Sequence, residues 1–233
     1  MRTLAGDGQL WWTGAIARGM AEADRAGAGV VVWLNDDCLP DAGALEQLRV
    51  RAAQNPPVIA GASCRTESST PVDSAFMGRT RHSVPPPGES EFAVDGLSGF
   101  CVAVPRGVWT AAGFPDAARF PHYYGDNAYT LRARQHGFSV LLLGTARARL
   151  AAYQERTHTI AHFFARLPVD ARHWSAVFAS PRSPFRAATQ WHYLRLRYGH
   201  VAGSLLAFAR LAKWQAEFIA AATGATGKFA AAP

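Results

Sequence analysis

The chain has 233 residues, 49% of them hydrophobic and 18% charged, with a formal net charge of +7. This is an ordinary globular composition, and its basic balance fits nucleic acid, an anionic membrane surface or a phosphorylated substrate. Three widely spaced cysteines exclude a disulfide framework or zinc ribbon, and no apolar run reaches the ~18 residues that span a bilayer. We therefore expect a cytoplasmic protein whose membrane contact is at most peripheral.

The first half of the chain alternates predicted helices and strands. Amphipathic spacing predicts a helix over residues 13–26, and the apolar run at 30–34 predicts a central parallel strand covered on both faces. Asp41 is a good N-cap for a second helix, and a second strand is expected over 58–64. This alternation predicts an α/β layer architecture.

A polar segment, residues 65–90, is expected to be a long surface loop because it is rich in Ser, Thr, Gly, Arg and Pro. Beyond it, a strand is expected over 97–104, and a short helix runs from Pro105 until Gly113 ends it. The remaining elements are expected to be a helix over 125–136, a strand over 138–143 and helical structure over 187–222.

Two adjacent carboxylates, Asp36 and Asp37, follow the strand predicted at 30–34. A plain turn explains them, since Asp is common in turns. Alternatively, they hold a divalent cation, because neighbouring carboxylates at the carboxyl end of a strand repel each other unless positive charge is near. Mg²⁺ and Mn²⁺ prefer such oxygen ligands together with substrate phosphates.

A second informative block runs from residue 94 to 137 and contains an aromatic stretch before Gly125-Asp126. Asp126 is explained as a helix N-cap. It is also placed to act as a general base that accepts a proton from a hydroxyl nucleophile. In that case Tyr124 and its aromatic neighbours could stack on a sugar ring.

Three segments, in order, resemble family 2 glycosyltransferases of the bacterial rhamnosyltransferase-like kind. They are GDGQLWWTGAIARGM (6–20), VVVWLNDDCLPD (30–41), and GLSGFCVAVPRGVWTAAGFPD through HYYGDNAYTLRARQHGF (96–138). The resemblance implies a GT-A fold, a Rossmann-like and mostly parallel α/β sheet that binds a nucleotide-sugar. A helical extension would follow at the C-terminus.

The resemblance also implies roles for single residues. Asp37 would bind Mg²⁺ or Mn²⁺, Asp36 would lie nearer the ribose, and Asp126 would be the catalytic base. The family often has Glu-Asp at that last position, so Gly125 is a departure from its pattern.

Four further residues are expected at the site through the same resemblance. Gly99 would let the backbone approach donor or acceptor, and Tyr124 would contact substrate. Trp11 and Trp12 match a tryptophan pair near the donor, although core packing explains them equally. His158 is a candidate late metal ligand; the alternative is an exposed helical histidine pair.

The family's first strand, helix and second strand have no counterpart here, so we expect residues 1–152 to be a partial GT-A domain and 153–233 a helical extension. Either the true start lies upstream or the gene is truncated. If Met1 is genuine, weak or no turnover is expected, because a sheet without these strands exposes its edges.

Arginine and aromatic residues alternate in the C-terminal helical region. Amphipathic helices packed on the domain explain them first, contact with anionic lipid headgroups second and nucleic acid third, since no nucleic-acid recognition motif is present.

Two functions are expected from these observations. The first is inverting, metal-dependent transfer of a sugar from a nucleotide-diphosphate sugar to a glycan or lipid-linked acceptor hydroxyl, in envelope or surface polysaccharide synthesis at the inner face of the cell membrane. The alternative is a non-catalytic remnant that binds a partner chain or a membrane surface.

Overall fold

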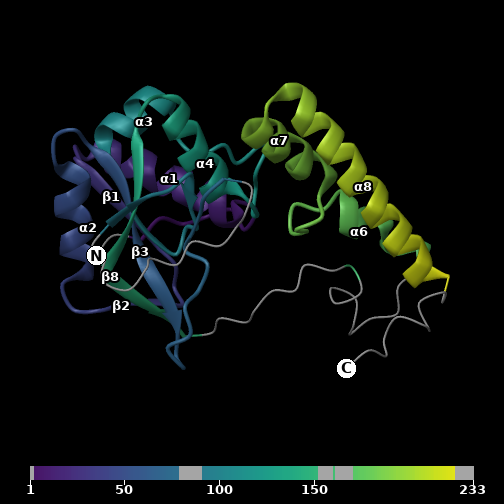
Figure 1. Cartoon of the computed structure of the whole chain (residues 1–233), viewed down its shortest axis with the longest axis horizontal. Coiled ribbons are helices and arrows are strands. Elements are labelled where there is room, and N and C mark those ends of the chain that lie inside the picture. The colour runs from purple at the N-terminus through teal and green to yellow at the C-terminus, as the bar shows by residue number, and fades with distance from the viewer. Residues whose placement is uncertain (1–2, 79–90, 152–159, 161–169, 224–233) are drawn as a thin grey trace. The chain divides into compact units, whose positions relative to one another are not determined.

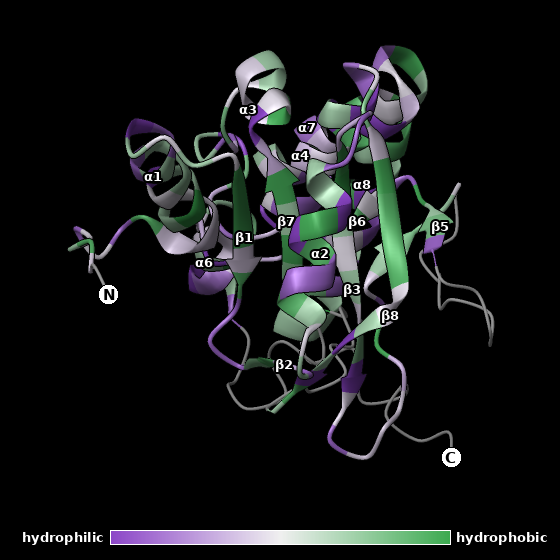
Figure 2. Ribbon diagram, turned by 90° about the vertical axis from the view of Figure 1, so that its left-hand side faces the viewer, coloured by the Kyte–Doolittle hydropathy of each residue, from purple (hydrophilic) through white to green (hydrophobic). Residues whose placement is uncertain are grey.

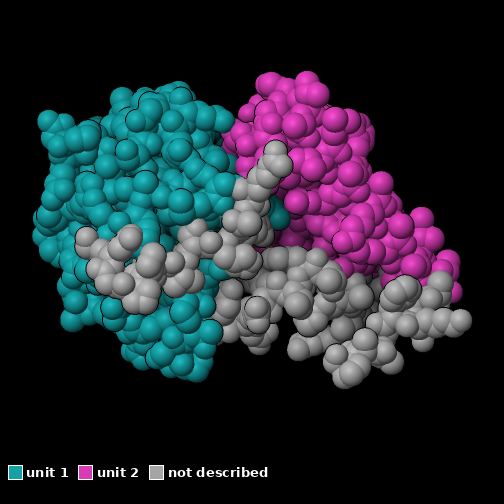
Figure 3. All heavy atoms as spheres, in the orientation of Figure 1, with its two compact units in different colours: residues 1–118, 124–154 teal, residues 119–123, 155–233 magenta. Residues whose placement is uncertain are grey.

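The computed structural model describes residues 3–78, 91–151, 160 and 170–223. The chain divides into two compact units, coloured separately in Figure 3. Unit 1 comprises residues 1–118 and 124–154, and unit 2 comprises residues 119–123 and 155–233.

Unit 1 contains the strands and four of the helices (Figure 1). Its helices are α1 (Trp11–Arg25), α2 (Ala44–Ala53), α3 (Arg106–Ala112) and α4 (Gly125–Gln135). Its strands are β1 (Val30–Leu34), β2 (Cys38–Pro40), β3 (Val58–Thr66), β4 (Ala75–Phe76), β5 (Glu91–Ala93), β6 (Gly96–Leu97), β7 (Cys101–Pro105) and β8 (Ser139–Leu150).

The main sheet has the order β1-β7-β3-β8-β2, with β5 also paired to β8. The expectation of a mostly parallel sheet is wrong for the described strands, because only β3 and β8 run parallel and the other pairs are antiparallel. The strand at 30–34 is also not central: among the described strands β1 pairs only with β7, and Leu34 is 43% exposed. A short apolar run does not reveal which neighbour a strand will have.

Helices cover both faces of this sheet, so the α/β layer prediction is confirmed. On one face α2 buries Leu48 and Ala52 against alternate residues of the strands. On the other face α1, α3 and α4 bury Met20, Trp109 and Tyr129. Figure 2 shows that β1 and β7 are coloured as hydrophobic strands, as expected for a sheet between two helical layers.

Several predicted boundaries differ from the structure for local reasons. The residue before α2, at its N-cap, is Gly43, whose φ of 79° lies in the left-handed region. Asp41, the predicted N-cap, instead forms a 2.7 Å ion pair with Arg65. The expected strand over 97–104 is two strands, because β6 pairs with β4 in a separate small sheet. Part of the predicted 65–90 loop is strand (β4), and residues 79–90 lie outside the described residues.

Unit 2 holds the short helices η1 (Ala171–His173) and α6 (Trp174–Phe178) and the longer helices α7 (Ala187–Tyr198) and α8 (His200–Ala222). The helical stretch predicted at 187–222 is thus two helices, broken at Gly199 where φ is 83°. A separate core gathers around Phe178, Phe185 and Phe218. No described helix is both long enough and apolar enough to cross a membrane.

Helices α7 and α8 come into backbone contact at Gly203. A Cβ atom at this position would lie 2.5 Å from the Arg195 Cα and 2.6 Å from the Leu194 carbonyl carbon. Real Cβ atoms do not approach backbone so closely, so the helix crossing depends on a glycine at this position.

We predict that Gly203→Ala lowers the free energy of unfolding by about 1–3 kcal/mol, because overpacking outweighs the better helix propensity of alanine. Gly19→Ala in α1 is the matched control, since nothing lies within 4 Å of its Cβ position. That control should be neutral or slightly stabilising. Urea unfolding followed by circular dichroism tests both, and a Gly203→Ala chain as stable as the parent contradicts the prediction.

Candidate active site

The carboxyl end of β1 meets the start of β7 at the edge of the sheet. The antiparallel register pairs Leu34 with Cys101, and the next rung is a 3.0 Å hydrogen bond from the Asn35 amide to the Phe100 carbonyl. The turn Asp36-Asp37 follows on one strand and Gly99 precedes on the other. The register thereby brings two segments far apart in sequence to one place.

Asp126 is held against this edge by two backbone amides. Its Oδ2 accepts a 2.7 Å hydrogen bond from the Gly99 amide, and its Oδ1 accepts one of 2.7 Å from the Asn127 amide. Asp126 is the second residue of α4, and the N-cap position belongs to Tyr124. The carboxylate thus lies at the positive end of the helix dipole.

The segment before Gly99 is fixed to the first turns of α4 by side chains. Asn127 Nδ2 donates to the Leu97 carbonyl at 2.8 Å, and the Leu97 amide donates to Thr130 Oγ1 at 3.1 Å. Both Asn127 and Thr130 are buried. Buried amide and hydroxyl groups are costly without partners, so these bonds set the position of the Asp126 carboxylate relative to the sheet.

Trp12 joins the two sides of the site. Its Nε1 donates a 2.8 Å hydrogen bond to Asn35 Oδ1, and its ring packs edge-on against Trp33 at 5.7 Å. Its ring edge also lies against Gly99, where a Cβ atom would be 2.6 Å from Trp12 Cη2 and 3.0 Å from the Asp126 Cβ. Trp12 therefore belongs to the core and to the candidate site at once.

Trp11 and Tyr124 have strained backbones beside these residues. Trp11 has φ 49° and Tyr124 has φ 66°, and only Ser69 shares a positive φ among the non-glycine residues of the described part of the chain. Bulky residues rarely adopt this conformation, and such strain gathers at functional sites. Both side chains are half-buried.

Asp36 is exposed and Asp37 is half-buried in the turn between β1 and β2. The Ala151 amide donates to the Asp37 carbonyl at 2.9 Å, which fixes the turn to the residue after β8. Neither carboxylate pairs with another described side chain, and nothing described brings either of them into contact with Asp126.

The Asp36-Asp37 turn supplies only part of the ligand set that a hard divalent cation needs. No group of three or more His, Cys, Asp or Glu side chains suited to a metal occurs in the described ranges. Two carboxylates are nonetheless enough for Mg²⁺ or Mn²⁺ when substrate phosphates and water complete the coordination. His158, the predicted late ligand, lies outside the described residues.

The cysteine that follows Asp37, Cys38, is buried in the core rather than exposed in the turn. Cys38, Cys64 and Cys101 are buried together in the core under the turn. A hydrogen bond with Cys38 and burial raise the pKa of both Cys64 and Cys101. Hydrogen bonds from Cys101 and Cys64 lower the pKa of Cys38 to about 4. The three thiols thus interact with one another inside the core.

Sequence reasoning missed three residues of this arrangement. Asn35 orients the Trp12 indole, Asn127 fixes the Leu97 segment, and Thr13 packs behind Gly125. The signal for Asn35 was present, because a half-buried indole N–H near a strand end needs an acceptor. Asn127 and Thr13 act through contacts that chain order does not reveal.

Gly125, the departure from the family's Glu-Asp pattern, has a steric explanation. A Cβ atom there would lie 2.9 Å from Thr13 Cγ2 and closer still to its Oγ1. Thr13 is fully buried, and its hydroxyl has no hydrogen-bond partner among the described residues. The first turn of α1 therefore occupies the space that a side chain at position 125 needs.

We predict that Gly125→Ala lowers the free energy of unfolding by about 1–3 kcal/mol through overpacking. Adding Thr13→Ala should recover at least half of that loss, because it removes the two clashing atoms. Gly107→Ala is the control, since its nearest neighbour would be 3.8 Å away. Urea unfolding of the parent, Gly125→Ala, Thr13→Ala, the double variant and the Gly107→Ala control tests this, and additive effects of the Gly125 and Thr13 changes contradict it.

We also predict that Gly99→Ala disturbs the site itself. The new methyl group must displace the Trp12 ring or the Asp126 side chain, which breaks the Trp12–Asn35 hydrogen bond or the Gly99–Asp126 hydrogen bond. The expected result is a change in the near-ultraviolet circular dichroism of the tryptophans with an unchanged far-ultraviolet spectrum. Identical near-ultraviolet spectra for Gly99→Ala and the parent chain would show that the contact is not tight.

Comparison with known proteins identifies the fold. No protein-family model matches the sequence, and a search of the curated proteins finds no match. Among the solved structures that match is the crystal structure of GalNAc-T7 with UDP, GalNAc and Mn²⁺, at a TM-score of 0.55 and 13% identity. The match covers 84% of this chain and 36% of that chain. The chain therefore has the α/β architecture of a GT-A glycosyltransferase, as predicted.

Proposed function

We propose that the chain carries the site of a glycosyltransferase that moves a sugar from a nucleotide-diphosphate sugar to an acceptor hydroxyl with inversion. The observation that carries this proposal is the connected set Trp12–Asn35–Phe100–Gly99–Asp126, which links the Asp36-Asp37 turn to a fixed carboxylate. A likeness in fold to a structure that contains UDP, GalNAc and Mn²⁺ supports the donor class.

In this proposal Asp126 is the general base. Its two oxygens accept hydrogen bonds from the amides of Gly99 and Asn127. A carboxylate oxygen can accept more than one hydrogen bond, and in this proposal Asp126 accepts the proton of the attacking hydroxyl. The two amide bonds fix the direction of the carboxylate, and such orientation contributes much of the rate in general-base catalysis.

The Asp36-Asp37 turn is proposed to hold the donor. Asp37 would bind Mg²⁺ or Mn²⁺ and Asp36 would lie nearer the ribose, with His158 proposed as a further metal ligand. When bound, the cation supplies positive charge against the departing diphosphate. The exposed Asp36 and half-buried Asp37 suit this role, because a donor must reach them from solvent.

The remaining site residues are proposed to shape the sugar pocket. Trp11, Trp12 and Tyr124 would pack on the substrate, and Gly99 would let it approach the backbone closely. Three sequence segments support the narrower family 2, rhamnosyltransferase-like assignment, and with it an envelope or surface glycan as acceptor and a place at the inner face of the cell membrane.

We predict that Asp126→Asn lowers kcat about 10²- to 10⁴-fold with little change in donor affinity, because an amide cannot accept the proton. Donor consumption with acceptor present and titration calorimetry of UDP-sugars with Mn²⁺ measure the two quantities. Glu46→Gln is the control, since Glu46 forms an exposed pair with Arg49 on the far helix α2. Undiminished turnover by Asp126→Asn would remove Asp126 from the proposed role.

We predict that Asp37→Asn weakens Mn²⁺-dependent UDP binding about tenfold or more, which corresponds to about 1.4 kcal/mol. The loss should disappear when binding is measured with EDTA in place of Mn²⁺. Parent chain that binds no nucleotide-sugar in the presence of Mn²⁺ would instead support the alternative, a non-catalytic binding module.

A further inference from the structure

Helix α8 of unit 2 exposes a continuous apolar stripe to solvent. The α8 stripe consists of Val201, Leu205, Phe208, Ala212 and Ile219, whose spacing places them on one face of a helix. The four large side chains are 76%, 66%, 63% and 58% exposed. The stripe runs along about 27 Å of helix, since each residue rises about 1.5 Å.

The opposite face of α8 is the one that packs within unit 2. Gly203 and Ala207 are buried where α7 crosses, and Phe218 is buried in the unit 2 core against Phe178 at 5.8 Å. The α8 stripe is thus not the side of the helix that the rest of unit 2 needs. So many large exposed side chains in one row usually mark a contact surface.

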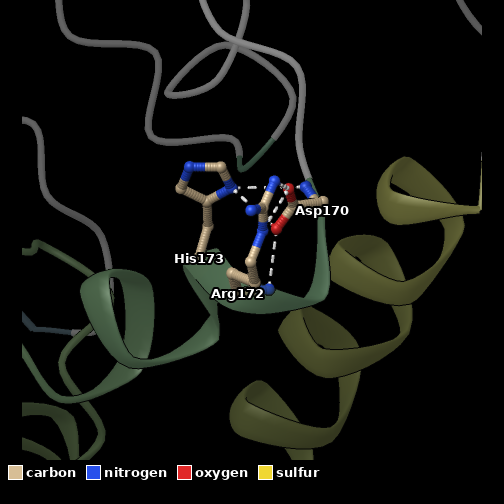
Figure 4. Close-up of polar contacts among 3 residues, drawn as sticks. All are labelled: Asp170, Arg172 and His173. Atoms are coloured by element: carbon tan, nitrogen blue, oxygen red, sulfur yellow. Dashed lines mark hydrogen bonds and ion pairs between the residues drawn. The ribbon is translucent and has the colours of Figure 1, made fainter.

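The surroundings of the stripe are basic. The described residues of unit 2 contain eight arginines and lysines and only two carboxylates, Asp170 and Glu217. Both carboxylates are already paired: Asp170 with Arg172 at 2.7 Å, as Figure 4 shows, and Glu217 with Lys213 at 3.7 Å. In contrast, Arg186, Arg195 and Arg210 contact neutral groups: the Arg119 carbonyl and Thr189, His200, and Gln190, respectively.

One of these cations lies directly beside the stripe. The Arg195 guanidinium stacks over the Trp191 ring at 5.1 Å, and Trp191 packs edge-on against Phe208 at 5.2 Å. Arg195 also contacts His200 Nδ1 at 2.7 Å, next to Val201. The α8 stripe, the Trp191 ring and the Arg195 guanidinium thus form one continuous surface. Helices that lie in a bilayer interface have the same combination of apolar, aromatic and cationic side chains.

We propose that unit 2 binds the surface of an anionic lipid bilayer through the α8 stripe, with Val201, Leu205 and Phe208 among the acyl chains and Arg195 at the headgroups. The helix lies on the membrane, since no described helix is apolar enough to cross it. The net positive charge of the described part of unit 2 attracts anionic lipid. The same charge opposes a second copy of the chain, because two such surfaces repel each other.

Vesicle co-sedimentation of the full chain tests this proposal. Phosphatidylcholine vesicles with and without roughly 30% phosphatidylglycerol serve as the probe. The parent chain should bind the anionic vesicles, and about 0.5 M NaCl should weaken binding by screening. The double variant Leu205→Glu/Phe208→Glu should bind at least about tenfold more weakly.

Leu45→Glu/Val50→Glu is the matched control, with the same change in charge at two exposed apolar positions of α2 in unit 1. It should bind like the parent, and circular dichroism checks that both variants fold. The proposal would be overturned if both variants lost vesicle binding equally, or if the parent chain bound no vesicles. It would also be overturned if the parent bound vesicles equally well with and without anionic lipid. Light scattering that shows a dimer dispersed by the stripe variant would overturn it as well. Vesicle binding needs no nucleotide-sugar, so its outcome is independent of the proposed transferase function.

Discussion

The hydrogen bond from the Gly99 amide to the Asp126 carboxylate is the interaction on which the candidate site depends. It joins the loop before β7 to the first turn of α4. The antiparallel pairing of β7 with β1 places the same loop beside the strand end that leads into the Asp36-Asp37 turn. Without it, the Asp36-Asp37 turn and Asp126 would be separate features of the fold. With it, a fixed carboxylate and a solvent-accessible acidic turn belong to one edge of the sheet.

The residues around this hydrogen bond leave the bonded groups little room to move. Trp12 occupies the space beside Gly99, Thr13 the space beside Gly125, and Asn127 and Thr130 hold the Leu97 segment. Packing of this density allows few alternative arrangements, because close-packed interiors deform in discrete steps. The strained conformations at Trp11 and Tyr124 persist because their neighbours fix them.

Local patterns in the sequence predicted much of unit 1. The helix now seen as α4, the strand β3 and the end of α3 at Gly113 followed from periodicity and capping residues. Strand partners did not follow, because the apolar run of β1 is compatible with either direction of pairing. Gly199 was overlooked as a break between α7 and α8, although its φ of 83° is one that glycine adopts readily. At the candidate site, the resemblance singles out Asp126 and Gly99, whereas Asn127 and Thr13 act through contacts that only the folded chain reveals.

The contact between Thr13 and Gly125 has a consequence for how this protein can vary. A side chain at position 125 and the Thr13 side chain compete for the same space, so the cost of a change at one position depends on the residue at the other. An acidic residue before Asp126 is therefore expected to fit best with glycine or alanine at position 13, because the two closest atoms of Thr13 are then gone. The two positions, distant in the gene, are thus coupled through one steric contact.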